Sequence, residues 1–387
     1  MAIDDSDPVK HLKVLASDAM EGRGSPSEGL NKAAKYIEGV MKSHGVVGPN
    51  PDDPRSPYFQ TFNFFQFAEP NFHAKRPGIV PEIATPQHKP RLYEYGFGLG
   101  AQPSMTHDDF KVLYERVRQH NPRAAKQLAP LLKSGPTLAP ANVGKKLAET
   151  MLEAKRGEVQ NVVGRIEGTG PNKDEVIVMM AHYDHLGTRF GTVYNGTSDN
   201  ASGSSILLSA IPELVKAQKA GQLNRSIVFL WTAAEEKGLV GAQYFVNNPI
   251  PGAELDKISG VVNIDMFGWF GPERMSAYVK TDGKENFLGD MLVQANNKLS
   301  DPFKKIEYNV DGFRNRQDGW VFMRKGKDVS FLFEGTDARG NLMPHYHKST
   351  DKLDKMEENN GFRKIRKGAQ LAAEMIKLAA NYKKPTP

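Results

Sequence analysis

Carboxylate and imidazole side chains stand directly after several apolar runs of this chain. These side chains are His182, Asp184, Glu235, Glu236 and Asp265. If the apolar runs are parallel strands, their carboxyl ends lie at one edge of a sheet, where the sites of open α/β proteins form. We therefore expect the five side chains to gather in one crevice.

Two predicted loops add further candidates. The stretch GTSDNASGSS places Asp199 just before a predicted helix, and MPHYHKSTD contains His345 and His347. Mixed imidazole and carboxylate ligands suit zinc, and two such ions can share one bridging carboxylate and one water. Two divalent cations would also offset three carboxylates and one hydroxide. The sequence therefore predicts two Zn²⁺ ions, for which Co²⁺ or Mn²⁺ could substitute.

Each of these residues also has a simpler interpretation. A histidine after a strand is often a hydrogen-bonded structural residue, and adjacent glutamates suit the start of a helix. Asp199 could be only a helix cap, beside Ser198 and Asn200. The metal interpretation depends on the whole set occurring together.

The elements that would position these side chains alternate between apolar strands and amphipathic helices. Strands are expected within residues 58–67, 158–168, 175–184, 225–236, 258–269 and 328–336. Helices are expected after Asp7, after Ser27 as far as Gly45, and at 202–220, 237–248 and 359–382. This alternation predicts an α/β fold of three layers, a mainly parallel mixed sheet flanked by helices. The turn-rich stretch 169–174 suggests that the second and third of these strands form a hairpin.

Residues 68–156 differ from the rest, because strand patterning fades and short helical stretches such as DDFKVLYERVRQH appear. We interpret the chain as a single domain, 1–387, with this helical and irregular subregion inserted. The insertion either packs as extra surface or serves as a lid or oligomer contact.

Composition excludes several classes of function. The chain has no cysteine, so disulfides, thiolate ligands and a cysteine nucleophile are excluded. The net charge of +6 comes without a long basic block, which argues against a nucleic-acid partner. No apolar run is long enough to span a membrane. The start, MAIDDSDPVK, lacks the features of a signal peptide, so we expect any signal to have been removed or replaced.

Five short motifs, in order, resemble the signatures of metallopeptidase family 28. They are AHYDHLG, SDNASG, AAEEKGL, NIDM and YHKSTD, and the resemblance covers about residues 160–355. LASDAMEGRG also resembles the N-terminal segment of bacterial members. The family contains co-catalytic zinc aminopeptidases, some carboxypeptidases and glutaminyl cyclases. The resemblance implies the zinc-dependent exopeptidase (phosphorylase/hydrolase-like) fold, a peptide substrate and export to the periplasm or the exterior.

Matching positions imply a role for each candidate. His182 and Asp265 would bind one ion, Glu236 and His347 the other, and Asp199 would bridge them. Glu235 would be the general base that takes a proton from a metal-bridging water. Asp184 would hold the His182 ring as a partner behind the metal. The family also implies a cis peptide between Asp199 and Asn200.

Residues outside the five motifs are less defined. We expect His345 to be a nearby polar group. Where many members have a histidine after an aspartate, this chain has Gly319 after Asp318, and Asp318 is interpreted as a cap of the short helix that follows. An apolar specificity pocket could be lined by Phe267, Trp269 and Trp320, although packing in the core is the commoner role of such aromatics.

The function that these observations favour is hydrolysis of peptide bonds by an aminopeptidase. A carboxypeptidase or another zinc amidohydrolase remains an alternative. A glutaminyl cyclase is less favoured, because it works with a single zinc and would need fewer ligands than this chain offers. From a different class, a binding module could have kept the fold without catalysis, but it would be expected to lack ligands. The oligomeric state is left open.

Overall fold

The computed structural model describes residues 5–66, 155–189, 191–281, 283–308, 310–334, 336–337 and 341–383, with short stretches between 79 and 138. The chain divides into two compact units. The first comprises Met1–Gln60 and Gln160–Pro387, and the second comprises Thr61–Val159.

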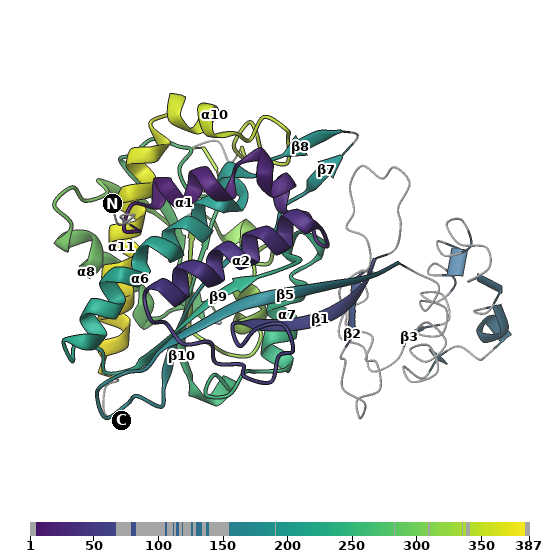
Figure 1. The fold of residues 1–387 in the computed structure, drawn as a ribbon, viewed down its shortest axis with the longest axis horizontal. Coiled ribbons are helices and arrows are strands. Elements are labelled where there is room, and N and C mark those ends of the chain that lie inside the picture. The colour runs from purple at the N-terminus through teal and green to yellow at the C-terminus, as the bar shows by residue number, and fades with distance from the viewer. Residues whose placement is uncertain are drawn as a thin grey trace. The chain divides into compact units, whose positions relative to one another are not determined.

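A mixed β-sheet forms the centre of the first unit (Figure 1). Its strand order is β14-β11-β15-β10-β6-β9-β5-β1, and β2 follows β1. The strands are β1 (Phe59–Gln66), β5 (Lys155–Ile166), β6 (Val176–His182), β9 (Ser226–Thr232), β10 (Ile258–Asp265), β11 (Arg274–Tyr278), β14 (Lys305–Glu307) and β15 (Val329–Phe333). The central neighbours β15, β10, β6 and β9 run parallel, whereas β5 and β11 are antiparallel to their inner neighbours. Two short two-stranded ribbons are separate from this sheet. In one, β7 (Gly187–Arg189) pairs with β8 (Thr192–Tyr194), and in the other, β12 (Lys280–Thr281) pairs with β13 (Lys284–Glu285).

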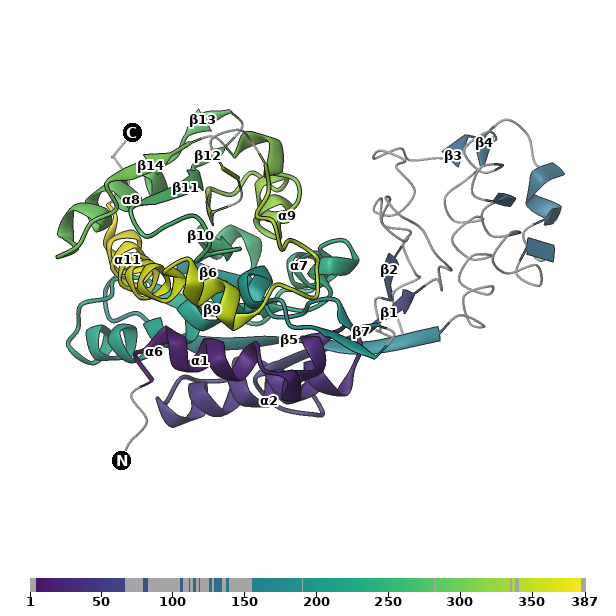
Figure 2. The same ribbon diagram turned by 90° about the horizontal axis from the view of Figure 1, so that it is seen from above.

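Helices cover both faces of this sheet, which gives the three layers expected from the sequence (Figure 2). One face carries α1 (Pro8–Leu15), α2 (Glu28–Ser43), α6 (Gly203–Lys219), α8 (Phe287–Lys298) and α11 (Gly361–Asn381). The other face carries α7 (Val240–Asn247) and α9 (Gly319–Met323), and α10 (Leu353–Glu358) precedes α11. The predicted fold class, an α/β mixed sheet flanked by helices, is confirmed.

Local sequence explains where several elements begin and end. Every residue of β6 and β9 is buried, as expected for parallel strands covered on both faces. The side chain of Asp7 caps α1 by accepting from the amide of Val9, and Ser27 caps α2 by accepting from Leu30. Gly45 lies in the left-handed region (φ +73°) just after α2, as predicted.

The predicted hairpin between residues 158–168 and 175–184 is wrong. In the sheet β9 lies between β5 and β6, antiparallel to the first and parallel to the second. The chain runs from β6 through α6 to β9, and β9 takes the place beside β6 that the short turn predicted for β5. The elements β11, α8 and β14 were also not anticipated.

In the second unit, residues Asn63–Gln66 of β1 pair antiparallel with β2 (Ile79–Glu82), and β3 (Met105–Thr106) pairs with β4 (Thr137–Leu138). Most of the predicted 68–156 insertion lies outside the described residues, so its role as a lid or oligomer contact stays a prediction. Within the described part of the chain, no helix is both long and apolar enough to cross a membrane.

Candidate metal centre

The carboxyl ends of β9, β6 and β10 place the predicted residues at one edge of the sheet. His182 is the last residue of β6 and lies level with Thr232, the last residue of β9, from which the turn to Glu235 begins. Asp265 ends β10, the neighbour on the other side of β6. The parallel arrangement therefore brings these three segments together, as the sequence predicts.

A first cluster consists of His182, Asp199 and Asp265, all buried. The Nε2 atom of His182 lies 3.2 Å from Asp265 Oδ1 and 3.3 Å from Asp199 Oδ1. The Nδ1 atom lies 3.1 Å from the backbone carbonyl of Asp184, to which it can only donate. This hydrogen bond assigns the proton to Nδ1 in the neutral ring and leaves the Nε2 lone pair directed at the two carboxylates.

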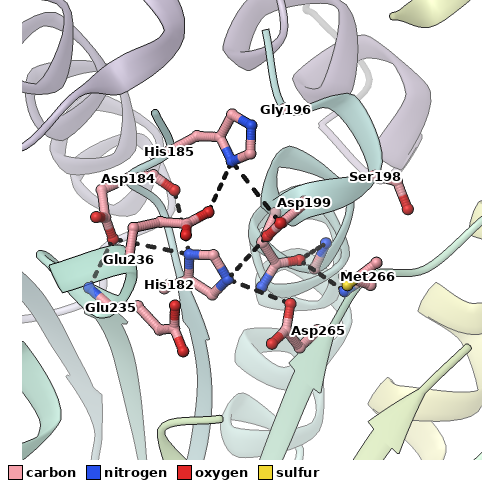
Figure 3. Close-up of polar contacts among 12 residues, drawn as sticks. His182, Asp184, His185, Gly196, Ser198, Asp199, Glu235, Glu236, Asp265 and Met266 are labelled. Carbon is pink, nitrogen blue, oxygen red and sulfur yellow. Dashed lines mark hydrogen bonds and ion pairs between the residues drawn. The ribbon is translucent and has the colours of Figure 1, made fainter. Parts of the chain in front are cut away.

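A second cluster shares Asp199 with the first (Figure 3). The Nε2 atom of His347 lies 3.2 Å from Asp199 Oδ2 and 3.1 Å from Glu236 Oε2. His185, which sequence reasoning did not assign, places Nδ1 2.9 Å from Glu236 Oε1 and 3.8 Å from Asp199 Oδ2. Asp199 thus directs one carboxylate oxygen to each cluster.

The donor set fits a pair of zinc ions. His182, Asp199 and Asp265 of the first cluster offer ligand atoms close enough to one another to bind a single ion, and so do His185, Asp199 and Glu236 of the second. Imidazole nitrogens and carboxylate oxygens are the ligand atoms zinc prefers. Without a cation, converging buried carboxylates would be costly. Burial opposes a charge on His347, yet Glu236 and Asp199 raise its pKa to about 10. The histidines thus supply positive charge where the acidic groups converge.

Glu235 stands beside the two clusters without joining either. Its side chain is buried and lines a pocket that opens next to His182, Asp265 and His347. Burial raises the pKa of the Glu235 carboxyl well above its usual value; His182 opposes this rise and Asp318 adds to it. A carboxyl in these surroundings is suited to hold a proton.

The carboxylate of Asp184 accepts one hydrogen bond from a backbone amide and one from a hydroxyl group. Its Oδ1 accepts from the amide of Glu235 at 3.0 Å, and its Oδ2 accepts from the Ser25 hydroxyl at 3.2 Å. The ring of His182 donates its Nδ1 hydrogen bond to the backbone carbonyl of Asp184. The Oδ1 atom of the Asp184 carboxylate lies farther from Nδ1, at 3.7 Å, and interacts with the ring through charge. Asp184 therefore connects the His182 segment to the turn that carries Glu235.

Left-handed backbone recurs at the centre. Ala234, Met266 and His347 have φ values of 55°, 52° and 56°, and each is, or is next to, a residue of the site. Non-glycine residues adopt this region rarely, and such residues concentrate at functional sites. The peptide between Asp199 and Asn200 is cis, as the resemblance implied.

The pocket next to the clusters is lined by aromatic and apolar side chains other than those predicted. They are Met266, Phe313, Phe331, Phe333, Leu342 and Tyr346, with Arg316 as a cationic member. Phe267 packs edge-on against Phe303, and Trp269 packs against the ring of His345. These two aromatics belong to the core, and Trp320 is also absent from the lining.

Asp318 and His345 both lie outside the two clusters. Asp318 does not cap α9 with its side chain; its buried carboxylate instead accepts a hydrogen bond from the Thr232 hydroxyl. His345 bonds Thr350 through Nδ1 at 2.8 Å and takes no part in either cluster. His185 could have been suspected from the sequence, because it is the second histidine of AHYDHLG.

Comparison with known proteins identifies a peptidase family. The sequence model described as Peptidase family M28 matches residues 161–370. The chain is 25% identical over 227 residues to "Aminopeptidase YwaD" of Bacillus subtilis, which covers 58% of this chain and 46% of that protein. It is 38% identical over 184 residues to "Leupeptin-inactivating enzyme 1" of Streptomyces exfoliatus, covering 46% and 36%. The chain thus spans less than half the length of these two relatives.

Solved structures share the fold. An aminopeptidase from Aneurinibacillus sp. strain AM-1 superposes with a TM-score of 0.58 at 16% identity, covering 97% of this chain and 93% of that one. A zinc aminopeptidase from Bacillus subtilis gives 0.58 at 16%, covering 96% and 94%. A Bacteroides thetaiotaomicron glutaminyl cyclase gives 0.52 at 13%, covering 98% of both chains.

Proposed function

The chain belongs to peptidase family M28, and from that premise we propose that it is a zinc-dependent aminopeptidase that removes residues from the N-termini of peptides. The observation that carries this proposal is the pair of clusters that share Asp199, with Glu235 beside them in the same pocket. The aminopeptidase names of the relatives and of the structural neighbours support the choice among peptidases.

Two ions would be held by the predicted ligands. His182 and Asp265 would bind one, Glu236 and His347 the other, and Asp199 would bridge them through its two oxygens. Zinc bound there would supply Lewis acidity, which polarises a carbonyl and lowers the pKa of water. His185 would stand behind Glu236, hydrogen-bonded to the oxygen that does not face His347.

Glu235 would move the proton. Its carboxylate would accept a proton from the attacking water and then deliver it to the leaving amine. Burial raises the pKa of Glu235 and favours its protonated form, which suits a carboxyl that carries a proton from the water to the amine. The hydrogen bond from the Glu235 amide to Asp184 would hold the turn while this transfer takes place.

Tyr346 and Arg316 would complete the pocket. The Arg316 Nη2 donates to the Tyr346 hydroxyl oxygen at 3.1 Å, which leaves the hydroxyl proton free to bond a substrate oxygen. Burial raises the pKa of Tyr346, so this proton stays in place. Apart from these two residues, Glu235 and the cluster residues, the side chains that line the pocket are apolar. This lining favours substrates with an apolar residue at the cleaved position.

The cationic Arg316 keeps a second candidate open. A guanidinium in a pocket beside the two side-chain clusters could bind the terminal carboxylate of a peptide, as a carboxypeptidase requires. Mass spectrometry of a mixed peptide pool incubated with the zinc-loaded protein separates the two, with an N-acetylated copy of the pool and a Glu235→Ala variant as controls.

Stepwise loss from free N-termini, absent from the acetylated pool and from the variant, is the expected result. Loss from C-termini, with acetylated peptides cut equally well, would replace the aminopeptidase assignment by the carboxypeptidase. No cleavage of any peptide by the zinc-loaded protein would contradict both.

A further inference from the structure

A buried arginine from the N-terminal region lies behind the metal centre. Arg23 has no exposed surface, and its guanidinium donates only to backbone carbonyls in the described contacts. Nε donates to Tyr183 (2.7 Å), Nη1 to Leu15 and Asn195 (2.8 Å), and Nη2 to Gly196 (2.9 Å). One side chain thus holds three separate parts of the chain.

Two of these parts carry predicted metal ligands. Tyr183 directly follows His182, and Gly196 lies three residues before Asp199. Arg23 therefore connects the end of β6, which carries His182, to the loop that carries Asp199, the carboxylate shared by both clusters. The backbone adds to this link, because Arg23 accepts from the amide of His185 at 3.1 Å and Gly24 forms a parallel bridge to His185.

Ser25 extends the contact to the third segment of the site. Its hydroxyl donates to Asp184 Oδ2 at 3.2 Å and accepts from the backbone amide of Ala234 at 3.2 Å. Asp184 in turn accepts from the amide of Glu235 (Figure 3). Ser25 therefore holds the left-handed turn at Ala234 that aims Glu235 and Glu236.

The packing leaves little room for another arrangement. Gly24 touches Gly187 so closely that a Cβ at position 24 would lie 2.9 Å from the Gly187 Cα. A Cβ on Gly196 would lie 2.4 Å from Cγ of His185, the ring that bonds Glu236. Backbone and side chains of residues 23–25 therefore fit directly against the three segments.

The charge of Arg23 has the sign the site needs. Burial lowers the pKa of Arg23 to about 10, so it remains a cation at neutral pH, attracted by Asp184, Asp351, Asp199 and Glu236. A cation enclosed behind converging carboxylates reduces the cost of keeping them ionised.

Building on the proposed function, we propose that Arg23, with Gly24 and Ser25, is a positioning element of the metal centre. It holds the turns of His182, Asp199 and Glu235–Glu236 in the geometry that binds metal. The residues lie outside the 161–370 segment matched by the family model, so the centre depends on a part of the chain beyond that match. Their contribution acts through other side chains rather than through contact with substrate.

Two variants test this element. Arg23→Lys keeps a buried charge but has three donors in place of five, and cannot reach four carbonyls in the same way. Ser25→Ala removes one hydroxyl only. Arg225→Lys is the control, because Arg225 is also buried (2% exposed) and donates to the carbonyls of Ala380 and Tyr382 at the opposite end of β9, besides pairing with Glu175. All three are compared by melting temperature, by zinc affinity in competition with a chromophoric chelator, and by the absorption spectrum of the Co²⁺-loaded protein.

Arg23→Lys and Ser25→Ala are expected to weaken zinc binding by about 10–100-fold and to change the Co²⁺ spectrum. Arg225→Lys is expected to lower the melting temperature while leaving both metal readouts at wild-type values. If Arg23→Lys does not fold, Ser25→Ala is judged by the same two readouts. Wild-type zinc affinity and an unchanged Co²⁺ spectrum in the folded variants would overturn the proposal. A wild-type protein that binds zinc but cleaves no peptide would instead refute the proposed function, and leave this test intact.

Discussion

The carboxylate of Asp351 accepts a hydrogen bond from the backbone amide of Asp199 at 3.1 Å. It also accepts from the amide of Ser198 at 3.0 Å, and its own carbonyl accepts from Thr197. Asp351 lies four residues after His347. The segment that supplies one ligand of the second cluster therefore also holds the loop of the carboxylate that both clusters share.

Removing this carboxylate is expected to destabilise the protein and weaken its metal site. Asp351→Ala leaves two buried amides without their acceptor, which costs about 2–4 kcal/mol of unfolding free energy. Zinc affinity is expected to fall by about 10–100-fold as the Asp199 loop loosens. Asp351→Asn keeps one acceptor oxygen and should lose less of both. Urea denaturation and chelator competition measure the two effects, and an Asp351→Ala variant with wild-type values for both would show that the loop does not depend on Asp351.

The buried carboxyl of Asp318 predicts a pH-dependent change in stability. Burial raises its pKa to about 7, against the opposing effects of His182 and Thr232. Between its ordinary pKa of 3.8 and about 7, the folded protein therefore binds a proton that the unfolded chain has released. The free energy of unfolding must fall as pH rises through this window, and stay lower above it.

Asp318→Asn removes that dependence. Measured without metal, the stability of the variant relative to wild type is expected to rise between pH 4 and pH 8, by at most about 4 kcal/mol. Urea denaturation in EDTA at pH 4, 6 and 8 measures the difference. A constant offset between the two proteins across this range would mean that the Asp318 carboxyl titrates normally.

Zinc binding is expected to release protons. In the metal-free protein Glu236 and Asp199 raise the pKa of His347 to about 10, against the effect of burial, and the carboxylates around His182 likewise raise its pKa. The His347 ring is therefore protonated at pH 7 and must become neutral to bind metal, so its proton leaves and zinc affinity falls as pH is lowered.

Calorimetry at pH 7 in two buffers of different ionisation enthalpy measures this release. His345→Ala is the control, because His345 contacts neither cluster and its pKa is lowered. The control is expected to release as many protons as wild type. Equal binding enthalpies in both buffers would contradict the predicted protonation of His347.

A buried ion pair beneath the loop after Asp265 predicts a stability effect away from the chemistry. Glu334 accepts from the amides of residues 268–270 and pairs with Lys364, and both side chains are buried. Lys364→Met leaves the carboxylate without its cation and is expected to cost about 3–5 kcal/mol. Adding Glu334→Gln should recover part of this loss, which a double-mutant cycle by urea denaturation would detect. Additive effects of the two substitutions would show that the pair does not interact.

The sequence predicted the elements with strong local signals. Continuous apolar runs ending in polar residues revealed β6, β9 and β10 together with His182 and Asp265, because a strand buried on both faces leaves its polar residues at its ends. Strand order was not predictable in the same way. The turn at 169–174 favoured a hairpin, whereas pairing of β9 with both β5 and β6 depends on contacts distant in sequence.

The residues that surround the site could not be predicted from local sequence patterns either. His185, Arg23 and Asp318 act through partners 51, 160 and 86 residues away, namely Glu236, Tyr183 and Thr232. The pocket aromatics Phe331 and Phe333 alternate along β15 and could not be told from core residues before the strand was placed. Motif positions therefore indicated residues that gather in the two clusters, and only tertiary structure located the side chains that hold them.

We propose that Glu235 transfers the proton at a zinc centre to which it is not itself a ligand. Glu235→Gln keeps the shape of the side chain and removes its ability to accept a proton. The most direct test is the cleavage rate of a free N-terminal peptide by this variant, with zinc content measured on the same sample by elemental analysis. We predict unchanged zinc content, equal to that of wild type, and a kcat lowered by about 10²–10⁴-fold. A Glu235→Gln variant that cleaves at the wild-type rate with zinc bound would contradict the proton-transfer role of Glu235.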